Sequence, residues 1–203
     1  VWSRYIYTYP ESGKEVMLVG TIRGLYELGK SGKYDEVEGK IQDLDEGKEF
    51  YVYCIDVPNK EKPNEVVIGT RKGARFLNVI NENSWLDSVV GFNSEVRTIT
   101  YSEGGYWFGT TYNGIAFKAD NTDTIKYYGE KDGLNSLDQN FVSLVNHKVT
   151  NINPKGIYIY DKESDAFVFD EKIGKIAKET NLKGVSKLVK DNTHFYLNMY
   201  NKN

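Results

Sequence analysis

Runs of apolar and aromatic residues alternate with short polar stretches along the whole chain, and one arrangement of them recurs. The stretch VVIGTRKGARF at residues 66–76 has a β-branched run, Gly-Thr, two further polar residues, a Gly and a second apolar run. Similar stretches are YWFGTTYNGIAF at 106–117, VMLVGTIRGLYEL at 16–28 and a more divergent copy, KVTNINPKGIYIY, at 148–160. An apolar run, a short turn with Gly and another apolar run form the pattern of a β-hairpin. The sequence therefore predicts four similar hairpins.

The spacing of these hairpins indicates a repeat protein. Their second glycine falls at positions 24, 73, 114 and 156, which gives intervals of 49, 41 and 42 residues. A nearly constant period in this range is typical of solenoids, propellers and arrays. Helical repeats are disfavoured because no 3.6-residue periodicity accompanies the pattern. Leucine-rich repeats are disfavoured because their period is shorter.

Each period has room for about four short antiparallel strands, which fits the blade of a β-propeller. We therefore predict an all-β fold in which residues 1–203 are part of one propeller domain, an arc of about four blades and the start of a fifth. The approximate blades are 1–40, 49–88, 94–130 and 140–172, with a partial fifth at 183–203. The rival is a β-sandwich, which also has short strands and frequent turns. A sandwich would not be expected to repeat Gly-Thr and Gly at the same places.

The two glycines of the repeat have different predicted roles. The later one, such as Gly73 or Gly114, supplies the positive φ of a tight turn. The glycine of Gly-Thr, at positions 20, 69 and 109, is expected to let neighbouring blades pack closely. A phosphate-binding loop is disfavoured because no helix follows and no Lys-Ser/Thr ends the motif.

Composition and charge narrow the function classes. The 203 residues are 39% hydrophobic and 14% aromatic, which is ample for a core made of strands. The formal net charge is −3 and no block of like charges stands out, so nucleic acid is not an expected partner. No apolar run is long enough to cross a bilayer, so we expect no membrane contact by this region itself. Because the chain begins and ends on strand-like sequence, we also expect it to be a piece of a longer protein.

Nothing in the sequence indicates catalysis or metal binding. Glycosidases need a pair of carboxylates, but most of the 29 Asp and Glu residues lie in turns, where solvated charge is expected. His147 and His194 are the only histidines, which leaves little for acid–base chemistry. The single cysteine, Cys54, cannot form an internal disulfide and is expected to be buried in a strand. We predict no catalytic residue, no metal site and no cofactor.

The alternation of residues along the predicted strands also predicts which aromatic side chains are buried. Trp107 lies in an alternating strand and is expected in the core between blades. Tyr127 and Tyr128 are adjacent in a strand, so one should face the core and the other should not. Tyr112 is at a hairpin tip, where an aromatic ring is not easily buried.

The strings VVIGTRKGARF and YWFGTTYNGIAF, with the connector YYGEKDGLNSLDQNFVSLV, resemble the two-component regulator propeller repeat. That repeat typically has a Gly-Leu connector, an inner strand, then Trp-Ile-Gly-Thr, a later Gly-Leu and an aromatic strand. Here residues 133–135 (GLN) and 140–142 (NFV) match the connector, and 107–110 (WFGT) and 114–115 (GI) match the hairpin. The resemblance covers nearly the whole chain.

The chain departs from the family pattern at two places, where Asn151-Ile152 replaces Gly-Thr and Ala74 replaces the usual Leu. The resemblance implies a periplasmic sensor domain of a hybrid histidine kinase or a related one-chain regulator. Such a domain would bind a glycan fragment or related small polar ligand and pass the signal to a downstream kinase. An oligosaccharide and a homodimer of the full-length receptor are the implied partners. A structural or protein-interaction propeller without a small ligand is the alternative, and an enzyme on a propeller is a third reading.

Four residues are predicted to line a ligand site. In an antiparallel four-stranded blade, the link from the second to the third strand lies on the same face as the connector to the next blade. The hairpin turns on that face carry cationic and aromatic side chains and no acid: Arg23, Arg71, Lys72, Lys155 and Tyr112. Arg and Lys recognise sulfate and carboxylate groups, although connector acids such as Asp138 lie on the same face. We predict that Arg71, Lys72, Tyr112 and Asn135 bind a glycan there; the alternative is that they are solvated turn residues.

Overall fold

The computed structural model describes residues 3–9, 12–28, 34–36, 51–80, 83–88, 92–175, 185–190 and 195–199. These residues are nearly all in β-strands and turns, which confirms the predicted all-β class. The helical segments among them are the short η2 (Glu130–Asp132) and a turn at 173–175. The chain divides into two compact units, Val1–Val96 and Arg97–Asn203, and each is described by itself.

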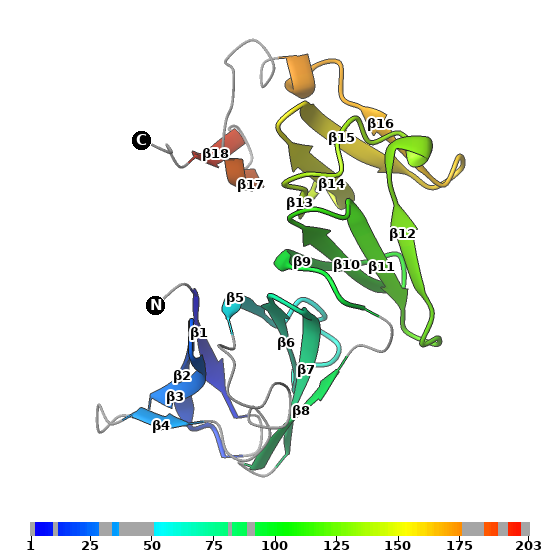
Figure 1. Cartoon of the computed structure of the whole chain (residues 1–203). Helices are drawn as coiled ribbons and strands as arrows, with labels where there is room; N and C mark the ends of the chain where they lie inside the picture. Colours follow the sequence, from blue (N-terminus) through cyan, green and yellow to red (C-terminus); the bar gives the residue numbers. More distant parts are fainter. Residues whose placement is uncertain are drawn as a thin grey trace. The chain divides into compact units, whose positions relative to one another are not determined.

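Unit 1 contains two antiparallel sheets in which every strand pairs with its neighbours in sequence (Figure 1). Sheet 1 consists of β1 (Ser3–Thr8), β2 (Glu15–Thr21), β3 (Gly24–Leu28) and β4 (Tyr34–Glu36). Sheet 2 consists of β5 (Val52–Asp56), β6 (Glu65–Thr70), β7 (Gly73–Ile80) and β8 (Asn83–Ser88). Each sheet therefore comes from one continuous stretch of chain.

Unit 2 repeats this order (Figure 1). Sheet 3 consists of β9 (Val96–Ser102), β10 (Gly105–Thr110), β11 (Ile115–Ala119) and β12 (Ile125–Tyr128), and only its first residue, Val96, belongs to unit 1. Sheet 4 consists of β13 (Phe141–Val145), β14 (Lys148–Asn153), β15 (Gly156–Asp161) and β16 (Ala166–Phe169). Two further strands, β17 (Val185–Lys190) and β18 (Phe195–Met199), pair with each other.

The core of unit 1 lies between its two sheets, where β5 packs against β1 and β2. Its buried side chains come from both sheets: Tyr7, Tyr9, Val16, Leu18, Leu25, Val52, Ile55, Val66, Ile68 and Leu77. Gly20 lets the sheets approach, because a Cβ there would lie 2.5 Å from the Val52 Cγ1 atom. This close approach confirms the role predicted for the glycine of Gly-Thr.

The core of unit 2 lies between sheets 3 and 4. Its buried residues are Trp107, Ile115, Tyr128, Leu134, Val142, Val149, Tyr158 and Phe167. Gly109 has the same role as Gly20, since a Cβ there would lie 2.5 Å from the carbonyl oxygen of Asn140. The Val142 amide also donates a hydrogen bond to the Thr98 hydroxyl at 2.7 Å, which joins sheet 4 to sheet 3. A larger residue at position 109 would therefore push against backbone atoms that are already fixed.

The predicted burial of the aromatic residues is confirmed. Trp107 is buried in the unit 2 core. Tyr128 is 2% exposed and the adjacent Tyr127 is 41% exposed, as expected for neighbours on opposite faces of a strand. Tyr112, at the hairpin tip, is 65% exposed.

The prediction for Cys54 is half correct. Cys54 lies in a strand, β5, but it is only partly buried. It pairs with Gly69 beside a register shift that falls between Val52 and Cys54. Such an irregularity interrupts the regular alternation of inward and outward side chains, which accounts for the partial burial of this residue.

The repeated hairpins share a hydrogen bond from threonine to glycine across the turn, which spans two intervening residues in the first two hairpins and three in the third. The hydroxyl groups of Thr21, Thr70 and Thr110 donate to the carbonyl oxygens of the glycines that follow at 24, 73 and 114, at 3.1, 2.8 and 2.8 Å. The turn glycines 73 and 114 have φ values of 98° and 69°, as predicted. Threonine and glycine therefore fix the turn together, one through its hydroxyl and the other through its backbone freedom.

The fourth hairpin corrects the alignment made from the sequence. Asn153, not Ile152, pairs with Gly156 and occupies the threonine position, so Ile152-Asn153 replaces Gly-Thr. The Asn153 side-chain oxygen accepts a hydrogen bond from the Lys155 amide at 2.9 Å. Thr70 accepts from the Lys72 amide in the same way, at 3.1 Å. Asparagine can replace threonine here because both side chains carry an acceptor that reaches the turn.

Candidate ligand-binding site

Hairpin turn and connector meet at the same end of a sheet in both units. In unit 1, the Gly73 amide donates to the Ser94 carbonyl at 2.7 Å. In unit 2, the Gly114 amide donates to the Leu137 carbonyl at 2.9 Å, and the Gln139 amide donates to the Thr111 carbonyl at 2.7 Å. The arrangement of links expected from the topology is therefore present in each unit. We call this end of a sheet its turn end.

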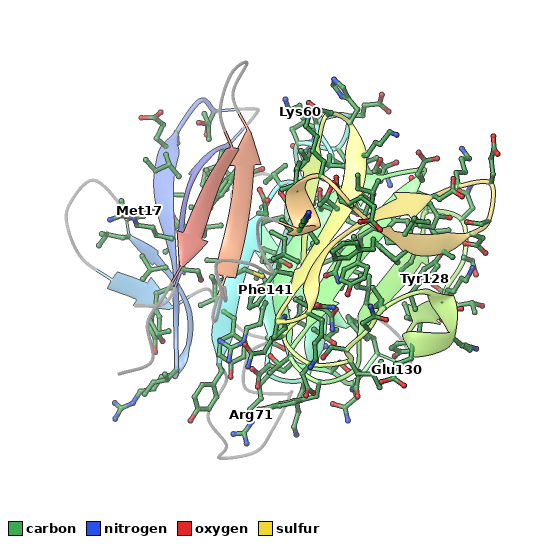
Figure 2. The ribbon with its side chains drawn as sticks, turned by 90° about the horizontal axis from the view of Figure 1, so that it is seen from above. Met17, Lys60, Arg71, Tyr128, Glu130 and Phe141 are labelled. Atoms are coloured by element: carbon green, nitrogen blue, oxygen red, sulfur yellow. The ribbon has the colours of Figure 1, made fainter. Side chains whose placement is uncertain are left out.

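The turn end of sheet 2 is cationic. Arg71 and Lys72 are both exposed between the paired ends of β6 and β7, and Figure 2 shows the Arg71 side chain extending away from the ribbon. The Arg71 guanidinium lies over the Tyr51 ring, 5.4 Å from its centroid, and the Arg71 amide donates to the Tyr51 carbonyl at 3.3 Å. A cation–π contact of this kind orients the guanidinium and leaves it accessible.

The turn end of sheet 3 is aromatic and rich in amides. Tyr112 is exposed at the tip, and the next amide, that of Asn113, donates to the Thr110 hydroxyl at 3.0 Å. Asn135 is exposed on the connector. Its side chain approaches the buried hydroxyl of Tyr158 and partly offsets the rise in pKa that burial causes there.

The four predicted site residues lie in two pairs, one in each unit. Arg71 and Lys72 are neighbours at the turn end of sheet 2. Tyr112 and Asn135 both lie at the turn end of sheet 3, where turn and connector are hydrogen-bonded. Because the pairs belong to different units, a single site formed by all four residues stays a prediction.

Two polar residues at the turn end of sheet 3 were missed by the sequence analysis. Arg97, in β9, donates from Nε to the Thr111 hydroxyl at 3.2 Å. Gln139, in the connector, has a φ of 52° and binds the carbonyl of the same threonine. No local motif marks either residue, because both reach Thr111 only through the pairing of strands and the path of the connector.

A second polar cluster lies at the outer edge of unit 2. The Asp165 carboxylate accepts hydrogen bonds from Lys126 Nζ, from the Tyr128 hydroxyl at 2.7 Å and from the Tyr160 hydroxyl at 2.9 Å. Lys126 and these hydroxyls hold the pKa of Asp165 down to about 2. Burial, with the hydrogen bonds to its neighbours, raises the pKa of Tyr128, which Figure 2 labels. The cluster fastens the β15–β16 turn to β12, so we assign it to the packing of sheet 4 on sheet 3.

The described part of the chain holds no group of His, Cys, Asp and Glu residues that could bind a metal ion. Nor does any helix in it have the length and apolar character needed to span a bilayer.

The chain is similar in fold to several solved structures. No protein-family model and no curated protein matches the sequence. The extracellular domain of BT4673 from Bacteroides thetaiotaomicron, described as a proposed one-component or hybrid two-component system, matches 91% of this chain at 17% identity, with TM-scores of 0.63 and 0.62 in two structures. That of BT3049, a proposed hybrid two-component system of the same organism, matches 80% with a TM-score of 0.61 and 15% identity.

A third similar structure is an auxiliary nutrient binding protein from Bacteroides thetaiotaomicron, with a TM-score of 0.54 and 10% identity over 81% of this chain and 40% of that chain. This chain spans 25% of the BT4673 domain and 22% of the BT3049 domain. At these identities the likeness shows the fold alone. The resemblance to two-component sensor domains, first seen in the repeats, is thus confirmed at the level of the fold.

Proposed function

We propose that the chain is part of a β-propeller in the periplasmic, ligand-sensing domain of a two-component signalling receptor. The observation that carries this proposal is the repeated four-stranded sheet whose turn and connector are hydrogen-bonded at one end. The extracellular location of the similar BT4673 and BT3049 domains supports a sensing role outside the cytoplasm. In this proposal the region is not an enzyme, and the signal passes to a kinase elsewhere in the receptor, which acts as a homodimer.

The order of strands favours a propeller over a sandwich. A Greek-key sandwich exchanges strands between its two sheets, whereas each four-stranded sheet here takes its strands from one stretch of chain. A structure of the full-length protein tests the proposal directly. A propeller requires the sheets to radiate from one axis, and two stacked sheets that share strands would contradict it.

The ligand that we propose is a glycan fragment bound at the turn ends. Arg71 and Lys72 offer charge-assisted hydrogen bonds at one turn end, and Tyr112 and Asn135 offer an aromatic ring and an amide at the other. The turn backbone is held by hydrogen bonds in both places, so these side chains stand on an ordered frame. Binding to an ordered frame loses less conformational entropy than binding to a mobile loop.

Titration calorimetry of the full-length protein against acidic and neutral oligosaccharides tests the proposed function. Alanine at Arg71, Lys72, Tyr112 or Asn135 should weaken binding of the oligosaccharide recognised by the wild type by about 1 kcal/mol or more. Lys60→Ala is the matched control for Lys72→Ala, because Lys60 is an exposed lysine in the link between β5 and β6, away from the β6–β7 turn (Figure 2).

Three results are informative. Binding that depends on these residues supports the proposal. Binding that none of the four substitutions changes would move the site elsewhere. The absence of glycan binding, together with specific capture of a protein partner, would favour the protein-interaction alternative.

A further inference from the structure

We propose that the turn end of sheet 3 binds a neutral pyranose unit, with Tyr112 as the stacking surface and Arg97 and Gln139 as hydrogen-bonding groups. This inference rests on the proposed function and specifies the ligand of one turn end. It differs from the anionic glycan that the cationic turn residues suggest.

Thr111 is the residue that organises this surface. It is buried, and it lies between Arg97 and Gln139, accepting from the Arg97 Nε at its hydroxyl and from the Gln139 amide at its carbonyl. Arg97 comes from β9 and Gln139 from the connector, so the two residues are brought together by the fold. Both residues are therefore held at Thr111, the residue that precedes Tyr112 in the chain.

Tyr112 itself is exposed on a turn in which two backbone amides are hydrogen-bonded. The Asn113 amide binds the Thr110 hydroxyl and the Gly114 amide binds the Leu137 carbonyl. Leu137 is 40% exposed and its Cδ2 atom would lie 3.4 Å from a Cβ at Gly114, so an apolar group stands close to the tip. An exposed aromatic ring on a fixed turn, beside an apolar side chain, suits the C–H face of a sugar ring.

The backbone of Gln139 provides a further argument. Its φ of 52° lies in the left-handed region, where Gly or Asn would be less strained than Gln. Strain of this kind persists where the surrounding structure imposes it, and it is frequent in binding sites. Glutamine offers a planar amide with two donors and an acceptor, which matches the paired hydroxyl groups of a sugar.

The charge of this turn end favours a neutral ligand. Residues 110–114 contain no charged group, and residues 133–140 contain one, Asp138, which is exposed. The positive charge of Arg97 is therefore matched by the negative charge of Asp138, and the other polar groups are amides and hydroxyls. An anionic sugar would meet the Asp138 carboxylate here, whereas the turn end of sheet 2 offers Arg71 and Lys72.

The test is titration calorimetry of the full-length protein with four hexasaccharide probes: cellohexaose, mannohexaose, galactohexaose and hexagalacturonate. We expect a neutral probe to bind, with an affinity that changes less than about twofold between low and high salt, since no ion pair is involved. Tyr112→Ala and Gln139→Gly should each weaken binding by about tenfold or more, as expected for the loss of a central contact.

Two matched variants separate a ligand contact from a structural role. Gln139→Gly removes the side chain and relieves the backbone, so its melting temperature should stay the same or rise while affinity falls. Gln139→Asn keeps the amide in a residue that tolerates this φ, so it should retain more affinity than Gln139→Gly. Equal affinity of Gln139→Gly and the wild type would overturn the role of the amide.

The remaining outcomes distinguish the inference from the proposed function. If only hexagalacturonate binds, and more weakly at high salt, the neutral subsite is wrong and the sensing role stands. Neutral binding that Tyr112→Ala leaves unchanged would place the site elsewhere, again leaving the sensing role intact. If no probe binds, both the subsite and glycan sensing are contradicted.

Discussion

The β6–β7 turn of unit 1 and the β10–β11 turn of unit 2 share a hydrogen-bonded frame and differ in exposed chemistry. In both, a buried threonine hydroxyl, that of Thr70 or Thr110, donates to the carbonyl of the turn glycine. Both turns are also hydrogen-bonded to the connector that follows their sheet. Unit 1 exposes Arg71 and Lys72 on this frame, whereas unit 2 exposes Tyr112. The hydrogen bond from Thr to Gly is therefore kept while the residues between them differ in chemistry and in number, two in unit 1 and three in unit 2.

The largest effect is expected from a change to the frame where sheets 3 and 4 meet. A Cβ at Gly109 would lie 2.4 Å from Thr98 Oγ1, 2.5 Å from the Asn140 carbonyl oxygen and 2.8 Å from the Val142 nitrogen. Because two of these are backbone atoms, Gly109→Ala should lower the free energy of unfolding by about 2–3 kcal/mol. Urea denaturation of the full-length protein measures it, with the exposed Asp123→Ala as the control. A loss below about 0.5 kcal/mol, the range of ordinary surface substitutions, would contradict the close packing.

A smaller loss is expected when the turn hydroxyl is removed. Thr110→Val keeps the shape of the buried side chain but removes the hydroxyl that donates to the Gly114 carbonyl and accepts from the Asn113 amide. The Gly114 carbonyl keeps the hydrogen bond from the Thr110 amide at 3.2 Å, so we expect a loss of about 1–2 kcal/mol for the two lost hydrogen bonds. The same substitution at Thr70 should have a similar effect, since the frame is shared. If only one of the two variants is destabilised, the turns are not equivalent.

Unlike the turn end, the Asp165 cluster at the outer edge of unit 2 should make a contribution to stability that depends on pH. The pKa of Asp165 is lowered in the folded protein, so this carboxylate stabilises the fold at pH values above its unfolded pKa. That contribution should be present above about pH 4 and be lost as the pH falls towards 2. Because the Asp165 side chain is half-exposed, Asp165→Asn should cost only about 0.5–1 kcal/mol at neutral pH.

Denaturation of the wild type and Asp165→Asn at pH 6 and pH 2.5 measures this contribution. The stability difference between the two proteins should shrink at the lower pH. A difference that stays constant over this range would mean that the carboxylate charge contributes nothing to the attachment of sheet 4.

The smallest effect is expected for the exposed residues between Thr and Gly. Lys72→Ala should change the free energy of unfolding by less than about 0.5 kcal/mol, because the Lys72 side chain is exposed and the turn depends on its backbone amide. Thermal denaturation beside Thr70→Val provides the comparison. A loss as large as that of Thr70→Val would show that the side chain, and not only the frame, holds the turn.

Much of the fold could be predicted from the sequence because its signals are local. Alternating apolar residues and a repeated Gly indicate strands and tight turns, and the position of Trp107 in such a strand indicates burial. The residue that replaces Thr in the fourth turn is predicted one position too early, at Ile152 instead of Asn153. The stretch NIN offers two asparagines, and only the strand register shows which one reaches the turn.

The candidate site was less predictable because it depends on contacts between segments far apart in sequence. Tyr112 was found because a hairpin tip is a local feature. Arg97 and Gln139 were not, since they meet only at Thr111, from a strand and a connector. The backbone conformation of Gln139 also has no sequence signal, because positive φ at glutamine is set by the surrounding structure.

We propose that the turn frame provides stability and that the exposed turn residues provide binding. Titration calorimetry of Tyr112→Ala in the full-length protein, with the oligosaccharide that binds the wild type, tests this division. We expect an affinity at least about tenfold weaker, since Tyr112 is the exposed aromatic of its turn end and truncating such an anchor is costly. The melting temperature should stay unchanged, because no contact of the frame is lost. Wild-type affinity in Tyr112→Ala would contradict the claim.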